Sequence, residues 1–189
     1  MHTIYLHGFC SSTASFKAQL VKQYVERDGK HTLFLIDLSY CPADAMETVE
    51  AHIATLSDKD WGLIGSSLGG FYATHLGEKY SKKSVLINPA VFAYELLSKL
   101  LGENKNYHSD EVFNFTQQHL DQLEAMHVPT IKRLENILLL TQTGDEVLDY
   151  KQGVNYYQGC EQVVIEGGDH GFSDYEQYLD TTFEFLQRT

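Results

Sequence analysis

One short stretch limits the possible folds of this chain more than any other: Ile64-Gly65-Ser66-Ser67-Leu68-Gly69-Gly70. It reads as a buried strand that runs into a Gly-x-Ser-x-Gly turn and leaves directly into a helix. Gly65 and Gly69 flank Ser67 at the two positions where any side chain would collide across so sharp a turn. The stretch therefore predicts a serine in strained backbone geometry at the end of a buried strand, where it can serve as a nucleophile.

The five-residue pattern has a simpler interpretation, a glycine-rich turn that only packs a helix closely against a sheet. Gly and Ser are common residues, so chance matches occur and the surrounding sequence has to decide. A serine nucleophile needs a base beside it and an acid that orients the base. When serine sits on such a turn, these partners follow it in the order acid, then histidine, each after a strand.

Two strand ends downstream of Ser67 carry such partners. The predicted strand Asn136–Leu140 leads to Asp145, and the predicted strand Gln162–Ile165 leads to His170. The carboxyl ends of parallel strands meet at one edge of an open α/β sheet, where ligands bind. We therefore expect Ser67, His170 and Asp145 to converge as nucleophile, base and acid.

Other acidic residues compete with Asp145 for this role. Glu146 and Asp149 fall where the next helix begins and are expected to favour its N-terminal dipole. Asp169 adjoins the candidate histidine, and adjacent residues rarely hold the ring in the needed orientation. The end of the fourth predicted strand carries Asn88-Pro89 and supplies no acid. Placement at a strand end favours Asp145.

Acyl transfer also needs hydrogen-bond donors aimed at the developing oxyanion. The first strand ends in His7-Gly8-Phe9, and we expect the backbone N–H groups of Phe9 and Leu68 to form an oxyanion hole. Alternatively, Gly8 only gives a tight turn its backbone freedom. Cys10 lacks the geometry of the serine turn and is expected to be a small buried residue beside the site.

The histidine pattern offers no support for a metal site, because it contains no HxH or HExxH spacing. We expect neither a metal nor a cofactor. Seven further histidines are interpreted as surface or satisfied core residues: His2, His31, His52, His75, His108, His119 and His127.

Composition narrows the class of partner. The net charge of −12, from 26 acidic and 14 basic residues, argues against nucleic acid, which requires a basic surface. No apolar run approaches the ~18 residues that a membrane span requires. The sparse thiols (Cys10, Cys41 and Cys160) and the absence of a signal-like leader predict free cysteines in the cytoplasm. The oligomeric state stays open.

The order of predicted elements favours an α/β fold within one domain over residues 1–189. Apolar runs such as Leu33–Ile36 suit strands buried on both faces of a mostly parallel sheet of about six strands, with helices on each side. Two segments, Asp44–Glu47 and Ser173–Glu176, read as capping boxes that open helices.

The interval 89–135 is too long for a single connection between a strand and a helix. Helical segments around Phe92–Leu101 and Thr116–Met126, with loose polar residues near Glu103–Asp110, predict a crossover helix plus a small helical lid. An extra helix pair packed on the periphery fits the pattern equally well. The interval is rich in aromatic residues that point either to an apolar acyl pocket or to core: Phe92, Tyr94, Tyr107, Phe113 and Phe115.

Together these residues resemble a serine hydrolase of the α/β-hydrolase superfamily, and more closely the small bacterial esterases of the YqiA type. The resemblance implies hydrolysis of carboxylic esters, with acyl thioesters as further substrates, through an acyl-enzyme on Ser67 assisted by His170 and Asp145. The chain departs from the familiar pattern with Cys10 in the first loop and Asp169 before His170. The likeness is carried by HGFCSS, GSSLGG, Asn88–Val91, Glu95–Leu97, Leu101–Asn104, Gln142–Tyr150 and Val164–Gly168.

Two other functions share these features. The same three residues support C–C bond hydrolysis or lyase-type chemistry, because the pocket rather than the fold determines the reaction. A hydrolase-like module that only binds a ligand is the second alternative. The arginines at positions 27, 133 and 188 form no clear clamp for a substrate with several phosphates.

Overall fold

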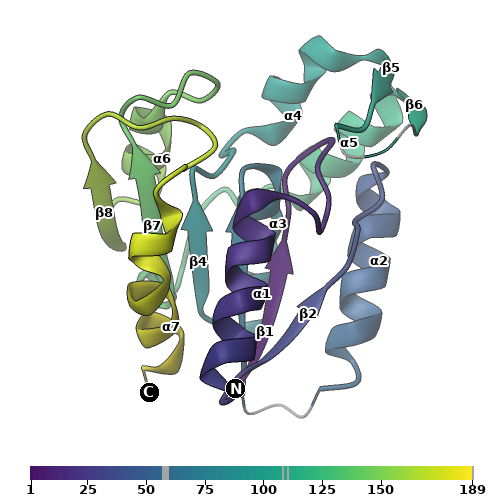
Figure 1. Cartoon of the computed structure of the whole chain (residues 1–189). Helices are drawn as coiled ribbons and strands as arrows, with labels where there is room; N and C mark the ends of the chain where they lie inside the picture. Colours follow the sequence, from purple (N-terminus) through teal and green to yellow (C-terminus); the bar gives the residue numbers. More distant parts are fainter. Residues whose placement is uncertain (57–59, 108, 110, 189) are drawn as a thin grey trace.

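The computed structural model describes residues 1–56, 60–107, 109 and 111–188, in which strands and helices alternate (Figure 1). The strands are β1 His2–Leu6, β2 Thr32–Leu35, β3 Trp61–Ser66, β4 Ser84–Ile87, β5 Gly102–Lys105, β6 Val112–Phe115, β7 Ile137–Gln142 and β8 Glu161–Ile165. The helices are α1 Phe16–Asp28, α2 Pro42–Ile53, α3 Leu68–Tyr80, α4 Ala93–Leu97, α5 Gln117–Met126, α6 Tyr150–Tyr156 and α7 Leu179–Gln187. Short 3-10 helices cover Ser98–Leu100, Leu134–Asn136 and Tyr175–Tyr178.

Six of the strands form one parallel sheet in the order β2-β1-β3-β4-β7-β8. The register pairs Tyr5 of β1 with Ile64 of β3, so the two strands end level with each other. Because all six run in the same direction, their carboxyl ends meet along one edge of the sheet. The predicted parallel α/β sheet is confirmed, and its loops carry the candidate residues to this common edge.

Helices cover both faces of the sheet (Figure 1), as the apolar strand runs predict. Successive strand residues point to opposite faces. Ile4 and Leu6 therefore pack with residues of α2 and α3, whereas Tyr5 packs with residues of α1 and α7. The sheet is thus the middle layer of three, and every central strand is buried from both sides.

Both helical stretches expected within the interval 89–135 are present, as α4 with the 3-10 turn after it and as α5, but an unexpected hairpin lies between them. Helix α4 is short, and β5 and β6 then form an antiparallel hairpin in which Gly102 pairs with Phe115. In β6, Phe113 and Phe115 are buried while Val112 is exposed, an alternation that suits a strand with one covered face. His108 and Asp110, which belong to the predicted polar stretch Glu103–Asp110, lie outside the described residues.

Both predicted capping boxes are wrong. Helix α2 begins at Pro42 after the N-cap Cys41, because the fixed φ of proline suits the first helical position, and Asp44 falls inside the first turn. Helix α7 begins after a 3-10 turn rather than at the predicted box. The Ser173 hydroxyl donates instead to Asp169 Oδ2 at 2.7 Å, within the loop that follows β8.

Candidate active site

Ser67 lies on the sharp turn between β3 and α3. Its backbone has φ 56° and ψ −118°, a conformation that residues other than glycine rarely adopt. Close packing explains the flanking glycines. A β-carbon on Gly69 would lie 1.9 Å from the Leu6 carbonyl oxygen, and one on Gly65 would lie 2.2 Å from the Gly69 carbonyl oxygen. The predicted strained serine turn is therefore present, and it raises the Ser67 hydroxyl at the edge of the sheet.

Hydrogen bonds connect the three predicted side chains, Ser67, His170 and Asp145, in that order. His170 Nε2 is 3.1 Å from Ser67 Oγ, and His170 Nδ1 is 2.8 Å from Asp145 Oδ2. The Asp145 side chain is only 1% exposed, and its Oδ1 accepts hydrogen bonds from the amides of Val147 and Leu148. A hydroxyl, an imidazole and a buried carboxylate are thus joined by hydrogen bonds, from the cavity to the interior.

The competing acids occupy other positions. Asp149 accepts from the Lys151 amide at the start of α6, the helix-capping role expected for it. Glu146 does not cap that helix. It extends to the loop after β8, where Glu146 Oε2 accepts from the His170 amide at 2.9 Å. The Asp169 side chain accepts from the Ser173 hydroxyl instead, and among the described contacts it makes no hydrogen bond to the imidazole.

Asn88 is a positioning residue that the sequence reasoning missed. Its side chain is buried at the end of β4, where Nδ2 donates to the carbonyls of Asp169 and His170 at 3.0 and 3.3 Å. Asn88 Oδ1 accepts from the Gln142 amide at the end of β7. The sequence carried one signal for this role, an asparagine before a proline at the end of a predicted strand. Asparagine tolerates a positive φ such as the 41° found at Asn88.

The loop after β1 lies against the serine turn, since a β-carbon on Gly8 would be 3.3 Å from Ser67 Cβ. Among the described residues the Phe9 amide donates to no backbone carbonyl, and Leu68 is the first residue of α3. Their role as oxyanion donors stays a prediction. Cys10 is half-buried rather than fully buried, has a φ of 54°, and burial raises the pKa of its thiol to about 11.

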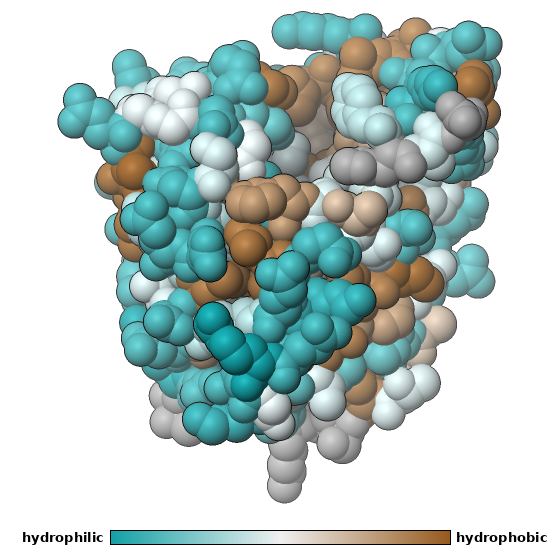
Figure 2. Space-filling model, viewed as in Figure 1, coloured by the Kyte–Doolittle hydropathy of each residue, from teal (hydrophilic) through white to brown (hydrophobic). Residues whose placement is uncertain are grey.

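A cavity of about 570 Å³ opens beside the candidate serine, within the size range of small-molecule sites. Figure 2 shows apolar side chains gathered around a hollow on the upper part of this face, near α4 and the N-terminal end of α1. Its lining is mostly apolar and includes Phe9, Phe16, Ser67, Leu96, Leu97, Leu100, Tyr107, Val147 and His170. The shape suits a substrate with an apolar part.

Of the five aromatic residues considered for an acyl pocket, Tyr107 lines this cavity. Phe113 and Phe115 instead pack edge-on against Phe9, with ring centroids 5.8 and 5.1 Å apart. Phe92 and Tyr94 contact His127 away from the cavity. The alternative that these aromatics are core is therefore correct for Phe113 and Phe115, whereas Phe92 and Tyr94 are partly buried and pack against the core.

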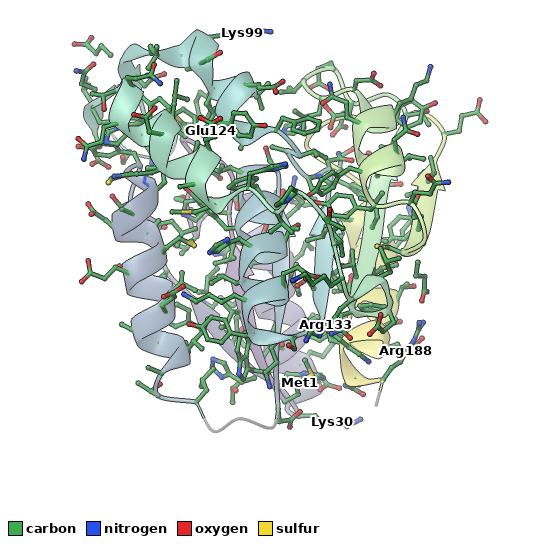
Figure 3. The ribbon with its side chains drawn as sticks, turned by 180° about the vertical axis from the view of Figure 1, so that it is seen from behind. Met1, Lys30, Lys99, Glu124, Arg133 and Arg188 are labelled. Atoms are coloured by element: carbon green, nitrogen blue, oxygen red, sulfur yellow. The ribbon has the colours of Figure 1, made fainter. Side chains whose placement is uncertain are left out.

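Two lysines in the cavity wall were not anticipated. Lys17 Nζ donates to the carbonyl of Gly171 at 2.5 Å, and burial lowers the pKa of this ammonium to about 8, although Asp169 and Asp145 act in the opposite direction. Lys99 also lines the cavity, and Figure 3 places it at the top of the molecule. Arg133 and Arg188 lie toward the opposite end of the molecule (Figure 3).

The described residues do not meet the requirements of a metal site, a membrane-spanning helix or a disulfide. Among them, no group of three or more His, Cys, Asp or Glu side chains is arranged to hold a metal ion. Within the same residues, helices of the length and apolarity that a bilayer crossing requires are absent. Cys10, Cys41 and Cys160 are free thiols.

A parallel six-stranded sheet with helices on both faces and a serine on the turn after β3 defines the α/β-hydrolase fold. Residues 2–187 match the model of an uncharacterised protein family, UPF0227. The chain therefore belongs to the UPF0227 family, and its resemblance to YqiA-type α/β-hydrolases is confirmed.

Comparisons with individual proteins agree with this assignment. A UPF0227 protein of Pectobacterium atrosepticum, ECA1814, is 30% identical over 132 residues, which cover 65% of this chain and 71% of that protein. A solved structure from Agrobacterium vitis S4 superposes with a TM-score of 0.79 at 20% identity, covering 98% of this chain and 88% of that one. Mouse alpha/beta hydrolase domain-containing protein 10 gives 0.71 at 18% identity, with coverages of 98% and 90%. These distant structures share the fold.

Proposed function

We propose that this protein is a serine hydrolase that cleaves carboxylic esters, including acyl thioesters, through an acyl-enzyme on Ser67. The observation that carries the proposal is the position of the His170 ring between the other two groups. Its Nε2 lies 3.1 Å from the Ser67 hydroxyl oxygen, and its Nδ1 lies 2.8 Å from the Asp145 carboxylate. Each distance is within the range over which a general base takes a proton from a hydroxyl nucleophile.

The hydrogen bond from His170 Nδ1 to Asp145 determines how the ring can act. When Nδ1–H donates to the carboxylate, Nε2 is left as the acceptor for the Ser67 proton. As the Ser67 oxygen attacks the acyl carbonyl, the proton moves to Nε2, and the carboxylate stabilises the resulting imidazolium. Two amide donors hold Asp145 in place during this step.

The oxyanion that forms on the carbonyl is assigned to the amides of Phe9, in the loop after β1, and Leu68, the first residue of α3. His170 then returns its proton to the leaving alcohol or thiol, the tetrahedral intermediate collapses, and an acyl-Ser67 ester remains. Water, deprotonated by the same ring, releases the acid and regenerates the hydroxyl. The mainly apolar cavity next to the serine supports an acyl chain as the group bound there.

Removal of the nucleophile tests the proposal. We expect Ser67→Ala to lower kcat on p-nitrophenyl butyrate by about 10³-fold or more while the thermal unfolding midpoint stays near that of the wild type. Ser98→Ala, which changes an exposed serine next in sequence to the cavity residues Leu97 and Lys99, serves as a matched control and should keep full activity. Retained hydrolysis by the Ser67 variant would contradict the assignment.

A covalent probe separates an enzyme from a hydrolase-like binding module. A fluorophosphonate should add its mass to the peptide that contains Ser67, because only an activated serine displaces the leaving group at a useful rate. The Ser67→Ala variant should remain unlabelled. Unlabelled wild-type protein, in a sample that still binds ester ligands, would favour the binding module instead.

A further inference from the structure

The lining of the cavity includes lysines but no carboxylates among the described residues, although the protein is strongly acidic. The chain carries a net charge of −12, yet the cavity lining includes Lys17 and Lys99 and, among the described residues, neither Asp nor Glu. A random sample of this surface would be richer in carboxylates than in lysines. The exclusion of acidic side chains therefore indicates that the cavity receives a group with negative charge.

Lys17 occupies a position that disfavours a cation. It lies in the first turn of α1, where the positive end of the helix dipole repels an ammonium, and that turn contains no acidic residue. The side chain is half-buried, and burial lowers the pKa of the ammonium. A local cost of this kind is typical of functional positions, because a bound ligand can compensate for it.

The hydrogen bonding of Lys17 leaves room for a ligand. An ammonium has three donors, and the hydrogen bond recorded for Lys17 Nζ is the one to the Gly171 carbonyl. No described carboxylate lies within 4.0 Å of it in an ion pair. Donors therefore remain for an anionic group in the cavity.

The location of Lys17 indicates which part of a substrate it would meet. Its hydrogen-bond partner, Gly171, directly follows His170, the residue that protonates the leaving group in the proposed reaction. Lys17 is thus held next to the loop that carries the proposed base, His170, and both residues line the same cavity. Leu96, Leu97 and Leu100, from α4 and the 3-10 turn after it, provide apolar surface for the acyl chain.

We propose that Lys17 binds a negatively charged group on the alcohol or thiol part of the substrate. The preferred substrates are then esters of an apolar acid whose alcohol or thiol carries a separate negatively charged group. This inference rests on the proposed hydrolytic function. Lys99, which lines the same cavity, adds to the attraction of an anion.

A purely structural role for Lys17 makes a different prediction. If its hydrogen bond to Gly171 only anchors the loop that carries His170, loss of the lysine slows every substrate by the same factor. If Lys17 binds the anion, its loss slows the charged substrate alone. The ratio of kcat/KM for two matched esters separates the two roles, because any effect on the loop cancels in that ratio.

The test uses 3-carboxyphenyl butyrate and 3-carbamoylphenyl butyrate, which differ only in the charge of the alcohol part. We expect the wild type to prefer the carboxylate, and Lys17→Met to lower that preference about tenfold, the typical contribution of a charge-assisted hydrogen bond. Lys17→Arg should retain most of the preference. Lys22→Met, which removes an exposed charge from the same helix, is the matched control and should leave the ratio unchanged.

An unchanged ratio in Lys17→Met, or a wild type without preference for the carboxylate, would overturn the inference. A wild type that hydrolyses neither ester nor p-nitrophenyl butyrate would refute the proposed function itself. Measurements at 0.05 and 0.5 M salt add a second criterion, since a direct contact in a half-buried site persists when long-range attraction is screened. Loss of the preference at high salt would also count against a direct contact.

Discussion

Three acidic side chains within five positions of the loop after β7 make three different contacts. Asp145 is buried and accepts from the imidazole, Glu146 accepts from the amide of the histidine loop, and Asp149 caps α6. All three have the same functional group, so the differences come from the direction in which the turn points each side chain. The amides of Val147 and Leu148 fix the direction of Asp145.

Replacement of Asp145 by asparagine should therefore be far more harmful than the same change at Asp149. The amide of Asp145→Asn can favour the wrong histidine tautomer, and we expect kcat on p-nitrophenyl butyrate to fall about 10³- to 10⁴-fold. Asn caps a helix as well as Asp does, so Asp149→Asn should change kcat less than about twofold. Equal losses in the two variants would show that the acid is not Asp145.

At the scale of elements, the position of the serine depends on how closely β3, α3 and β1 approach one another. The first turn of α3 packs against the end of β1 so tightly that Gly69 has no space for a β-carbon. The Ala90 and Gly70 amides both donate to the Ser67 carbonyl, which ties the turn to the loop after β4. The strained serine is held by its neighbours rather than by its own preference.

We expect Gly69→Ala to lower the free energy of unfolding by about 1–3 kcal/mol or more, because β1 or α3 must move to admit the methyl group. Gly153→Ala on α6 is the matched control. Its β-carbon would be 3.9 Å from the nearest atoms, and the change should stabilise the helix by about 0.5–1 kcal/mol. Urea denaturation measures both, and a Gly69 variant as stable as the wild type would contradict the packing argument.

At the scale of the whole molecule, several histidines are held neutral by partial burial. Burial lowers the pKa values of His2, His31, His52 and His75 below the ordinary 6.5. His2 and His52 share a contact of 2.8 Å between their Nε2 atoms, in which one ring must act as the acceptor. Protonation of both rings removes that acceptor, so the folded state resists taking up protons here.

Stability should therefore fall as the pH is lowered from 7.5 to 5.5. Below pH 6.5 the unfolded chain binds more protons at these histidines than the folded one, and the stabilisation present above that pH is lost. Urea denaturation across this range, which lies above most carboxylate titrations, measures the slope. Replacement of His75 by Gln should make the slope shallower, whereas a stability that rose toward pH 5.5 would refute the argument.

Local patterns were sufficient for a large part of this structure. The strained turn at Ser67 follows from residues adjacent in the sequence, the two glycines that flank it. The meeting of Ser67, Asp145 and His170 was also predictable, because the carboxyl ends of parallel strands share one edge. Their roles in catalysis stay predictions.

Contacts between distant segments decided the rest. The buried asparagine Asn88 and the lysine Lys17 depend on partners up to 154 residues away, such as the Gly171 carbonyl. The β5–β6 hairpin packs its Phe113 and Phe115 against Phe9 of the distant loop after β1. A polar side chain carries no mark in the sequence of whether it will face solvent, hold a loop or line a cavity. Periodicity and turn chemistry are properties of neighbouring residues, whereas burial and charge environment arise only when the layers pack together.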